Sequence, residues 1–273
     1  MRPARTVNRQ IWRESGLSSG RRSIPEETAV ALTYNGGTHA VMMTTPQDLE
    51  DFAVGFSLSE GIIRSTADID SLDVMYLEEG VELRMWLRKS ETDRLQERRR
   101  HIVGPTGCGL CGIESISDAM RPAAIIRHGQ QFSPEQIMAA MESVPLLQQL
   151  NIETRAVHAA AFWDSTSGIV ALREDVGRHN ALDKLSGALA RASIGASEGM
   201  ILLTSRVSVE MVQKSAAIGA PVVVSVSAPT ALAVRMADAA GITLAAIARA
   251  DGFEVFTHPG RISNGPVVNV SYR

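Results

Sequence analysis

Several residue types are scarce in this chain, and each scarcity excludes a class of protein. Aromatic residues make up 4% of the 273 residues, too few for the stacking platforms that bind single-stranded nucleic acids. The net charge of −3, from 27 basic and 30 acidic residues, argues against a general nucleic-acid binder. Charges interrupt the most apolar late stretch, 231–250, and no apolar run follows the basic first residues. We therefore expect a cytoplasmic protein without a membrane span or signal peptide.

Cysteine is nearly absent as well. The two cysteines, Cys108 and Cys111, lie in one glycine-rich stretch, residues 104–115. Glycine disfavours the interior of helices and strands, so this stretch is predicted to be a movable loop. In a chain without an export signal, two nearby cysteines are more often reactive or metal-binding than a structural disulfide.

Four interpretations of this cysteine pair compete. A zinc site needs further ligands at compatible spacing, but the chain has no second CxxC or HxxxH pair, so no zinc is expected. A thioredoxin-like pair normally follows a strand and opens a helix, which the glycines here do not favour. A pair of inert buried thiols is disfavoured because apolar neighbours are few. A persulfide carrier needs an exposed, movable thiolate, and glycine-rich flanks favour it.

The first half of the chain predicts a smaller α+β subdomain. Residues 1–26 lack periodicity and are predicted to be a loose lead-in to a subdomain over 27–150. That subdomain should contain a helix that starts near 45–48 and two hairpins around turn signals, 28–34 with 38–44 and 72–77 with 81–87. It should end with the cysteine loop and a helix from 133 to about 149, which a serine cap, a proline and a capping-box glutamine open.

The second half, 151–273, predicts an α/β domain. After a hairpin, 157–163 with 168–173, helices alternate with strands: 180–191, 199–204, 208–218, 221–226, 230–240 and 242–248. This alternation is typical of a largely parallel sheet covered by helices.

Polar residues follow the strands of this predicted sheet. In parallel sheets the loops that leave the carboxyl ends gather on one edge, where helix N-termini offer N–H groups to anions. Residues 204–208, 227–230 and 249–252 meet that description, and 174–180 is expected to join them. Arginines with hydroxyls suit a phosphate-bearing or nucleotide-like ligand. For each serine or threonine, a helix cap is an equally good interpretation.

Longer motifs give the chain a family resemblance. It resembles the formate dehydrogenase accessory sulfurtransferase (FdhD-like) family from about residue 25 to residue 262. The matching segments are residues 107–112, 174–184, 205–214 and 227–230, together with 44–50 and 60–63 nearer the N-terminus. These motifs are long, so chance is a poor explanation.

The resemblance implies a function and its residues. Members take sulfur from a cysteine desulfurase as a persulfide and pass it to the molybdenum (or tungsten) bis-guanine-dinucleotide cofactor before it enters the formate dehydrogenase apoenzyme. Cys108 would carry the persulfide, with Cys111 beside it in the relay, in a homodimer. The cofactor would be bound by Ile247, Ala248, Arg249, Ala250, Asp251, Gly252, His179, Ser205, Arg206, Ser208, Ser227 and Thr230.

The family's fold resembles cytidine deaminase, and this implies a cytidine-deaminase-like mixed sheet flanked by helices. A zinc deaminase needs H-x-E and P-C-x-x-C at two helix starts. The corresponding starts here, 178–180 and 205–208, contain neither the glutamate nor the cysteines, so no deaminase reaction is expected. Ser205 stands where the family usually has glycine. Two alternatives remain open: a cofactor-binding chaperone without sulfur chemistry, and a thiol redox regulator.

Overall fold

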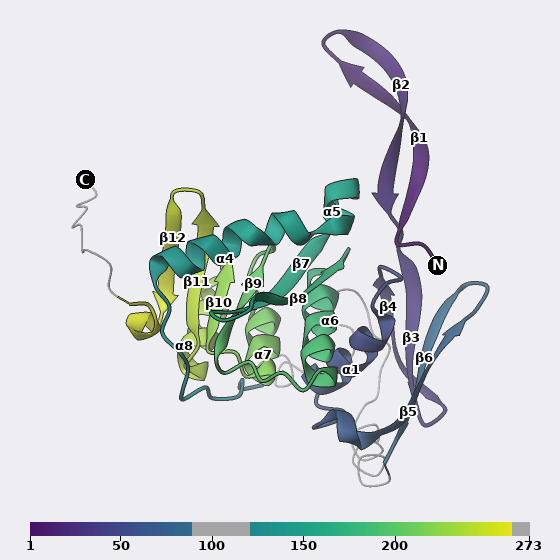
Figure 1. Cartoon of the computed structure of the whole chain (residues 1–273). Helices are drawn as coiled ribbons and strands as arrows, with labels where there is room; N and C mark the ends of the chain where they lie inside the picture. The colour runs from purple at the N-terminus through teal and green to yellow at the C-terminus, as the bar shows by residue number, and fades with distance from the viewer. Residues whose placement is uncertain (89–120, 264–273) are drawn as a thin grey trace. The chain divides into compact units, whose positions relative to one another are not determined.

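The computed structural model describes residues 1–88 and 121–263 (Figure 1). By contacts, the chain divides into two units. Unit 1 takes residues 1–122, 148–160 and 173–194, and unit 2 takes 123–147, 161–172 and 195–273. The units do not follow the expected boundary at residue 150, because the helix predicted over 133–149 belongs to unit 2 and the helix predicted over 180–191 belongs to unit 1.

Unit 1 begins with a feature that the sequence did not predict. Residues 1–26 are not a loose lead-in, because β1 (Ala4–Arg13) and β2 (Gly16–Pro25) pair antiparallel over their whole length. Gly16 adopts a φ of +106° beside the turn, a conformation that favours glycine. Most residues of both strands are exposed or only half-buried. The hairpin therefore lacks the clear apolar alternation by which strands are recognised in a sequence.

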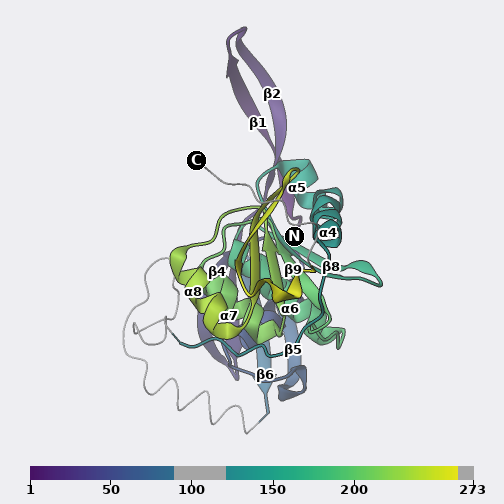
Figure 2. The same ribbon diagram turned by 90° about the vertical axis from the view of Figure 1, so that its left-hand side faces the viewer.

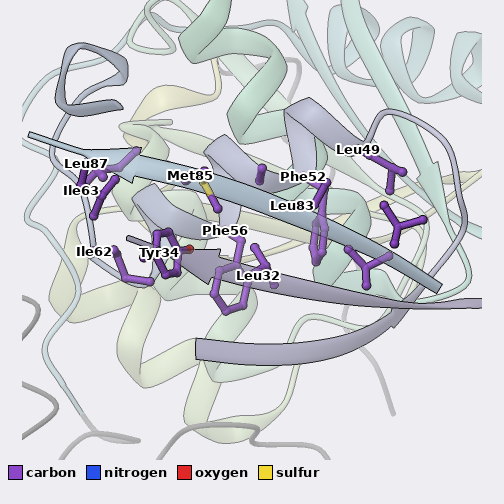
Figure 3. Close-up of a cluster of buried hydrophobic side chains, with 13 residues drawn as sticks. Leu32, Tyr34, Leu49, Phe52, Phe56, Ile62, Ile63, Leu83, Met85 and Leu87 are labelled. Carbon is purple, nitrogen blue, oxygen red and sulfur yellow. The ribbon is translucent and has the colours of Figure 1, made fainter. Parts of the chain in front are cut away.

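A four-stranded sheet and a helix form the main core of unit 1. The strand order is β4-β3-β6-β5, and the elements are β3 (Thr28–Tyr34), β4 (Gly37–Thr44), α1 (Leu49–Ser59), η1 (Thr66–Asp68), β5 (Ile69–Tyr76) and β6 (Gly80–Leu87). Both predicted hairpins are confirmed. The helix starts later than predicted, since its N-cap residue is Asp48, with a φ of +54°. Figure 3 shows Phe52 and Phe56 of α1 among Leu32, Leu83 and Met85 of the sheet.

Unit 1 also contains α5 (Gln149–Thr154) and α6 (Arg178–Arg191). Helices α1 and α6 approach until their backbones meet. A Cβ at Gly55 would lie 1.7 Å from the carbonyl oxygen of Asp183, and one at Gly187 would lie 1.9 Å from that of Asp51. Real Cβ atoms do not come this close, so only glycine fits at either position. This contact explains why α6 groups with the N-terminal elements, which helical periodicity alone does not reveal.

A six-stranded sheet has the order β12-β11-β10-β9-β7-β8. Its members are β7 (His158–Asp164), β8 (Gly168–Asp175), β9 (Gly199–Leu203), β10 (Val222–Ser225), β11 (Thr243–Arg249) and β12 (Gly252–Thr257). The predicted parallel core is confirmed, because β10 pairs parallel with both β9 and β11. The antiparallel edge strand β12 was not predicted. Strands β7 and β8 run across the unit boundary.

Helices cover both faces of this sheet in unit 2. Helix α4 (Pro134–Leu147) lies on one side, and α7 (Val209–Ile218) and α8 (Ala231–Ala240) lie on the other, as Figure 2 shows. Ile137 and Met141 of α4 pack against Met200 and Val222 of the sheet. The predicted capping box is confirmed, since Gln136 N donates to Ser133 Oγ at 3.2 Å and Gln136 Oε1 accepts from Ser133 N at 2.9 Å. A short 3-10 turn, η2 (Pro259–Arg261), follows β12.

The fold is thus mixed α/β, with several sheets and flanking helices, as the alternation of elements predicted. The more specific likeness to cytidine deaminase stays a prediction. In residues 1–88 and 121–263, every helix is too short or too polar to cross a bilayer.

Candidate functional site

The predicted site has two parts, and the structure describes one of them. Cys108 and Cys111 lie outside the described residues. The other part is the carboxyl edge of β9, β10 and β11, which belongs entirely to unit 2. We call the loops 204–208, 226–230 and 247–252 at this edge the strand-end loops.

Backbone hydrogen bonds join the first two strand-end loops. Val207, with no exposed surface, forms a parallel bridge with Pro229. Its N–H donates to the Ala228 carbonyl at 3.4 Å, and its carbonyl accepts from Thr230 N at 2.9 Å. An apolar side chain thus anchors the loop between two polar neighbours, Arg206 and Ser208. Their positions at one edge were predicted, whereas the anchoring role of Val207 was not.

A buried serine adds a second connection between these loops. Ser225 Oγ donates to the Ser205 carbonyl at 2.6 Å and accepts from Ser227 N at 3.1 Å. Ser205 is 4% exposed, and its own hydroxyl donates to the Arg206 carbonyl at 3.1 Å. The backbone of Ser205 does not have a positive φ. The glycine that is usual in the family is therefore not required here for conformational reasons, and serine fits without strain.

The third loop is tied to the second through an irregular strand end. Ile247 N donates to the Ser227 carbonyl at 3.4 Å. The register of β11 with β12 shifts after Ala246, where Ile247 has a φ of +54°. For a β-branched residue this conformation is a genuine outlier, and such bulges re-aim side chains near sites. Ala248 is buried, and Arg249 pairs with Gly252 across the turn formed by Ala250 and Asp251.

The charge at this edge suits an anion. Arg206 and Arg249 are both exposed, and within the described part of the chain neither forms a side-chain hydrogen bond or ion pair. Helices α7 and α8 begin here, with Ser208 and Thr230 as N-cap residues. The positive ends of their dipoles point to the same edge. Asp251, in the turn beside Arg249, contributes one negative charge.

Some of the hydroxyls predicted to bind the ligand form hydrogen bonds with the protein backbone instead. Thr230 Oγ1 accepts from Ala233 N at 3.2 Å, so it caps α8 as an ordinary N-cap threonine. The hydroxyl of Ser205 is turned to the backbone, as described above. Ser208 does not cap α7 with its side chain. Thr230 and Ser205 are therefore less available to a ligand than the two exposed arginines.

A buried ion pair lies in the motif 174–184 of unit 1. Lys184 and Asp175 have no exposed side-chain surface, and their Nζ and Oδ2 atoms are 2.7 Å apart. Lys184 Nζ also donates to the Thr45 carbonyl at 2.9 Å. Burial lowers the pKa of Lys184, and the neighbouring Asp175 opposes this shift. Sequence reasoning assigned no role to either residue, although a lysine between Leu182 and Leu185 was a signal.

The Asp175 carboxylate accepts several further hydrogen bonds. The donors are the Thr44 hydroxyl, Thr45 N at 3.0 Å, Gly177 N at 2.7 Å and Asn180 Nδ2 at 3.0 Å. Asp175 therefore fixes the start of α6 against the end of β4. Asp175 and its partners within the motif, Gly177, Asn180 and Lys184, therefore have a structural role.

Next to it, Glu174 accepts from the backbone N–H groups of Leu150 and Asn151, both at 2.8 Å, and so caps α5. Burial raises the pKa of Glu174, while these two hydrogen bonds act in the opposite direction.

Three basic side chains remain in this part of unit 1. Burial lowers the pKa of His158, and the nearby positive charge of Arg178 adds to the shift. The Arg178 Nε atom is buried and has no hydrogen-bond partner among the described residues. His179 is the second residue of α6. Since it belongs to unit 1, its predicted place beside the strand-end loops stays a prediction. Within the described ranges, no three His, Cys, Asp or Glu side chains gather into a metal site.

Comparison with known proteins decides the family. The model of the FdhD/NarQ family matches residues 25–263, almost the whole chain. The chain belongs to the FdhD/NarQ family. Among its FdhD relatives, the sulfur carrier protein FdhD of Agrobacterium fabrum is 50% identical over 264 residues, which cover 94% of this chain and 96% of the relative. The sulfur carrier protein FdhD of Cupriavidus necator is 48% identical over 93% of this chain and 88% of its own.

A solved structure supports the same fold. The crystal structure of a candidate formate dehydrogenase accessory protein from Desulfotalea psychrophila matches with a TM-score of 0.74. The match covers 96% of this chain and 100% of the other, at 23% sequence identity. At that identity the likeness concerns the fold alone, and the FdhD/NarQ assignment rests on the family model and the closer relatives.

Proposed function

We propose that this chain is a sulfur carrier, a sulfurtransferase that matures formate dehydrogenase. It takes persulfide sulfur from a cysteine desulfurase on Cys108 and delivers it to a molybdenum bis-guanine-dinucleotide cofactor held at the strand-end loops. Membership of the FdhD/NarQ family and the names of the relatives support the general role. The homodimer implied by the resemblance and the cytoplasmic location expected from the sequence are part of the same proposal.

The sulfur step follows ordinary thiol–persulfide exchange. The Cys108 thiolate attacks the terminal sulfur of the desulfurase persulfide, a new S–S bond forms on Cys108, and the desulfurase thiolate leaves with the electrons of the old S–S bond. When the sulfur is passed on, an electron pair of the acceptor attacks the terminal sulfur and forms the new bond to it. The S–S bond then breaks, and its electrons remain on Cys108, which returns to a thiolate. Cys111, three positions along the chain, would assist the relay.

The observation that carries the cofactor part of the proposal is the edge of β9–β11. Three separate loops are tied together by hydrogen bonds, and two arginines stand exposed on them beside two helix N-termini. Guanidinium groups and helix N-termini are the groups that proteins use for phosphates. The cofactor is the cargo here, and its guanine dinucleotide arms supply the phosphates that Arg206 and Arg249 would bind.

Titration with GDP tests this part. We expect Arg206→Gln and Arg249→Gln each to weaken GDP binding by about tenfold to a hundredfold, the effect of losing one charge-assisted hydrogen bond. Arg127→Gln, an exposed arginine outside the strand-end loops, is the matched control. Equal affinity of all four proteins would exclude these two arginines from the phosphate site.

A cofactor-binding chaperone without sulfur chemistry is the second candidate function. It would bind its ligand at the same edge of β9–β11, and this edge is the part of the predicted site that the structure describes. The two functions separate in a maturation assay of formate dehydrogenase. A sulfur carrier loses maturation with Cys108→Ala while GDP still binds. A chaperone keeps maturation with both cysteines replaced and loses it with Arg249→Gln.

A further inference from the structure

Two basic side chains of unit 1, those of His158 and Arg178, lie where a strand begins and a helix begins. His158 is the first residue of β7, and Arg178 is the first residue of α6, which follows β8. Strands β7 and β8 are neighbours in the sheet and are joined by residues 165–167, so they run antiparallel. The start of β7 therefore lies beside the end of β8, and His158 is close enough to Arg178 to feel its charge.

Both side chains lack a hydrogen-bond partner within the part of the chain that the structure describes. Among residues 1–88 and 121–263, neither the imidazole of His158 nor the guanidinium of Arg178 forms a hydrogen bond or an ion pair. The Nε atom of Arg178 is buried all the same. A buried N–H group without an acceptor is costly, and such a group in a folded protein needs an explanation.

The acidic side chain that attracts His158 is already occupied. Asp175 forms the buried ion pair with Lys184. It also accepts the four further hydrogen bonds described above. A carboxylate has about four lone-pair sites, so these donors fill Asp175. The acceptor that Arg178 needs is therefore not supplied by this neighbour.

The first turn of α6 adds positive charge at the same place. Its N-cap residue, Gly177, has no side chain that could cap the helix, and the turn contains no acidic residue. Arg178 and His179 hold the first two positions instead. Basic residues are unfavourable at this end of a helix, because the helix dipole is positive there, whereas an anion is favourable.

We propose that Arg178 and His158, with the first turn of α6, bind a phosphate-type oxyanion. A guanidinium presents Nε–H and an Nη–H side by side, which matches two oxygens of one anion. The imidazole supplies one further N–H. Arg178 and the helix end together offer about +1.5 charges, and a phosphate carries about −1.5 to −2 near pH 7, so phosphate fits better than a carboxylate.

All of these groups belong to unit 1. The site is therefore built without the strand-end loops, and the proposal does not depend on the sulfur chemistry.

Proton NMR of the histidine C2–H signals tests the site on the full chain. The signal of His158 is identified by its loss in His158→Gln. Burial and the charge of Arg178 lower the pKa of His158, and a bound phosphate should raise it, because the anion favours the imidazolium. We expect half of this effect at about 1 mM phosphate, the affinity that two charge-assisted hydrogen bonds give. Sodium chloride at equal ionic strength controls for screening of the Arg178 charge.

The matched variants are Arg178→Gln and Arg127→Gln. Arg178→Gln should need at least about tenfold more phosphate for the same effect. Arg127→Gln changes an exposed arginine of unit 2 and should respond as wild type does. A His158 pKa that phosphate leaves unchanged, or an equal response of Arg178→Gln and wild type, would overturn the proposal.

Urea unfolding separates ligand binding from a structural role of Arg178. Without phosphate, Arg178→Gln should be at least as stable as wild type, because it removes a charge that has no partner. With phosphate, wild type should gain stability by mass action and the variant should not. If Arg178→Gln is destabilised by the same amount in both buffers, Arg178 has a structural role only and the proposal is wrong.

A phosphate at this site is either a free ion or a group of a larger ligand. Titration of inorganic phosphate and of GMP against the His158 signal, in an Arg206→Gln/Arg249→Gln background, distinguishes the two. A response to both identifies a site for phosphate esters, and a response to inorganic phosphate alone identifies a site for the free ion. If this background abolishes every response, the anion is bound at the strand-end loops instead, and the assignment to Arg178 and His158 fails.

Discussion

Replacement of Lys184 by methionine should destabilise unit 1 strongly. The change keeps much of the side-chain volume but leaves the buried Asp175 carboxylate without its cation. Breaking a buried ion pair by removing one partner typically costs about 3–5 kcal/mol. Four other donors remain on Asp175, so we expect the lower end, about 3 kcal/mol. This is a large share of the roughly 5–15 kcal/mol that stabilises a typical domain.

Removal of the other charge of this ion pair should destabilise unit 1 more. Among the described residues, Asp175→Asn leaves Lys184 with the Thr45 carbonyl as its remaining hydrogen-bond acceptor, and it places an amide N–H₂ among groups that donate. We expect about 4–5 kcal/mol. The double variant should be about 2 kcal/mol or more less destabilised than the sum of the single variants, because neither charge is then left alone.

Urea unfolding followed by tryptophan fluorescence measures these effects. In a Trp163→Phe background the remaining tryptophans, Trp12 and Trp86, both report unit 1.

The pH dependence of the unfolding free energy is a second, independent test. Burial lowers the folded pKa of Lys184, so between that pKa and about 10.4 the unfolded chain binds more protons. The stability advantage of wild type over Lys184→Met should therefore grow as pH rises through this window. A cost below about 1 kcal/mol for Lys184→Met, with additive single variants, would refute this reasoning.

Four further changes have defined outcomes. Gly187→Ala should cost several kcal/mol by urea unfolding because its Cβ would strike the Asp51 carbonyl, whereas Gly195→Ala, which meets open space, should be nearly neutral. Thr230→Ala should cost about 1 kcal/mol, the usual loss of an N-cap. Ser205→Gly should not strengthen GDP binding in titration calorimetry, because Ser205 does not have a positive φ whose strain a glycine would remove. Because the folded pKa of His158 is lowered, wild type should lose stability relative to His158→Gln as pH falls below about 6.5, measured by urea midpoints.

Local signals predicted much of the fold. The capping box at Ser133 and the alternation of helices with strands after residue 180 are determined by nearby residues, and the structure confirms both. The β1–β2 hairpin and β12 were missed because neither shows a clear apolar alternation. The partner of α6 was missed because a glycine contact such as that of Gly187 is visible only in three dimensions.

The site was predictable where topology determines it. Parallel strands bring their carboxyl ends together, so the meeting of the loops after β9, β10 and β11 followed from the order of elements. The order of elements does not predict which side chains stay available to a ligand. The capping hydrogen bond of Thr230 and the hydrogen bond of the Ser205 hydroxyl to the backbone depend on atomic detail. The buried pairing of Lys184 with Asp175 was hidden for the same reason, since charged residues suggest a surface.

The most direct test of the proposed function is mass spectrometry of the purified chain after incubation with a cysteine desulfurase and cysteine. The account predicts one added sulfur atom on the peptide that contains Cys108, lost on reduction and absent from Cys108→Ala. A Cys108→Ala protein that acquires sulfane sulfur at the wild-type level would contradict it.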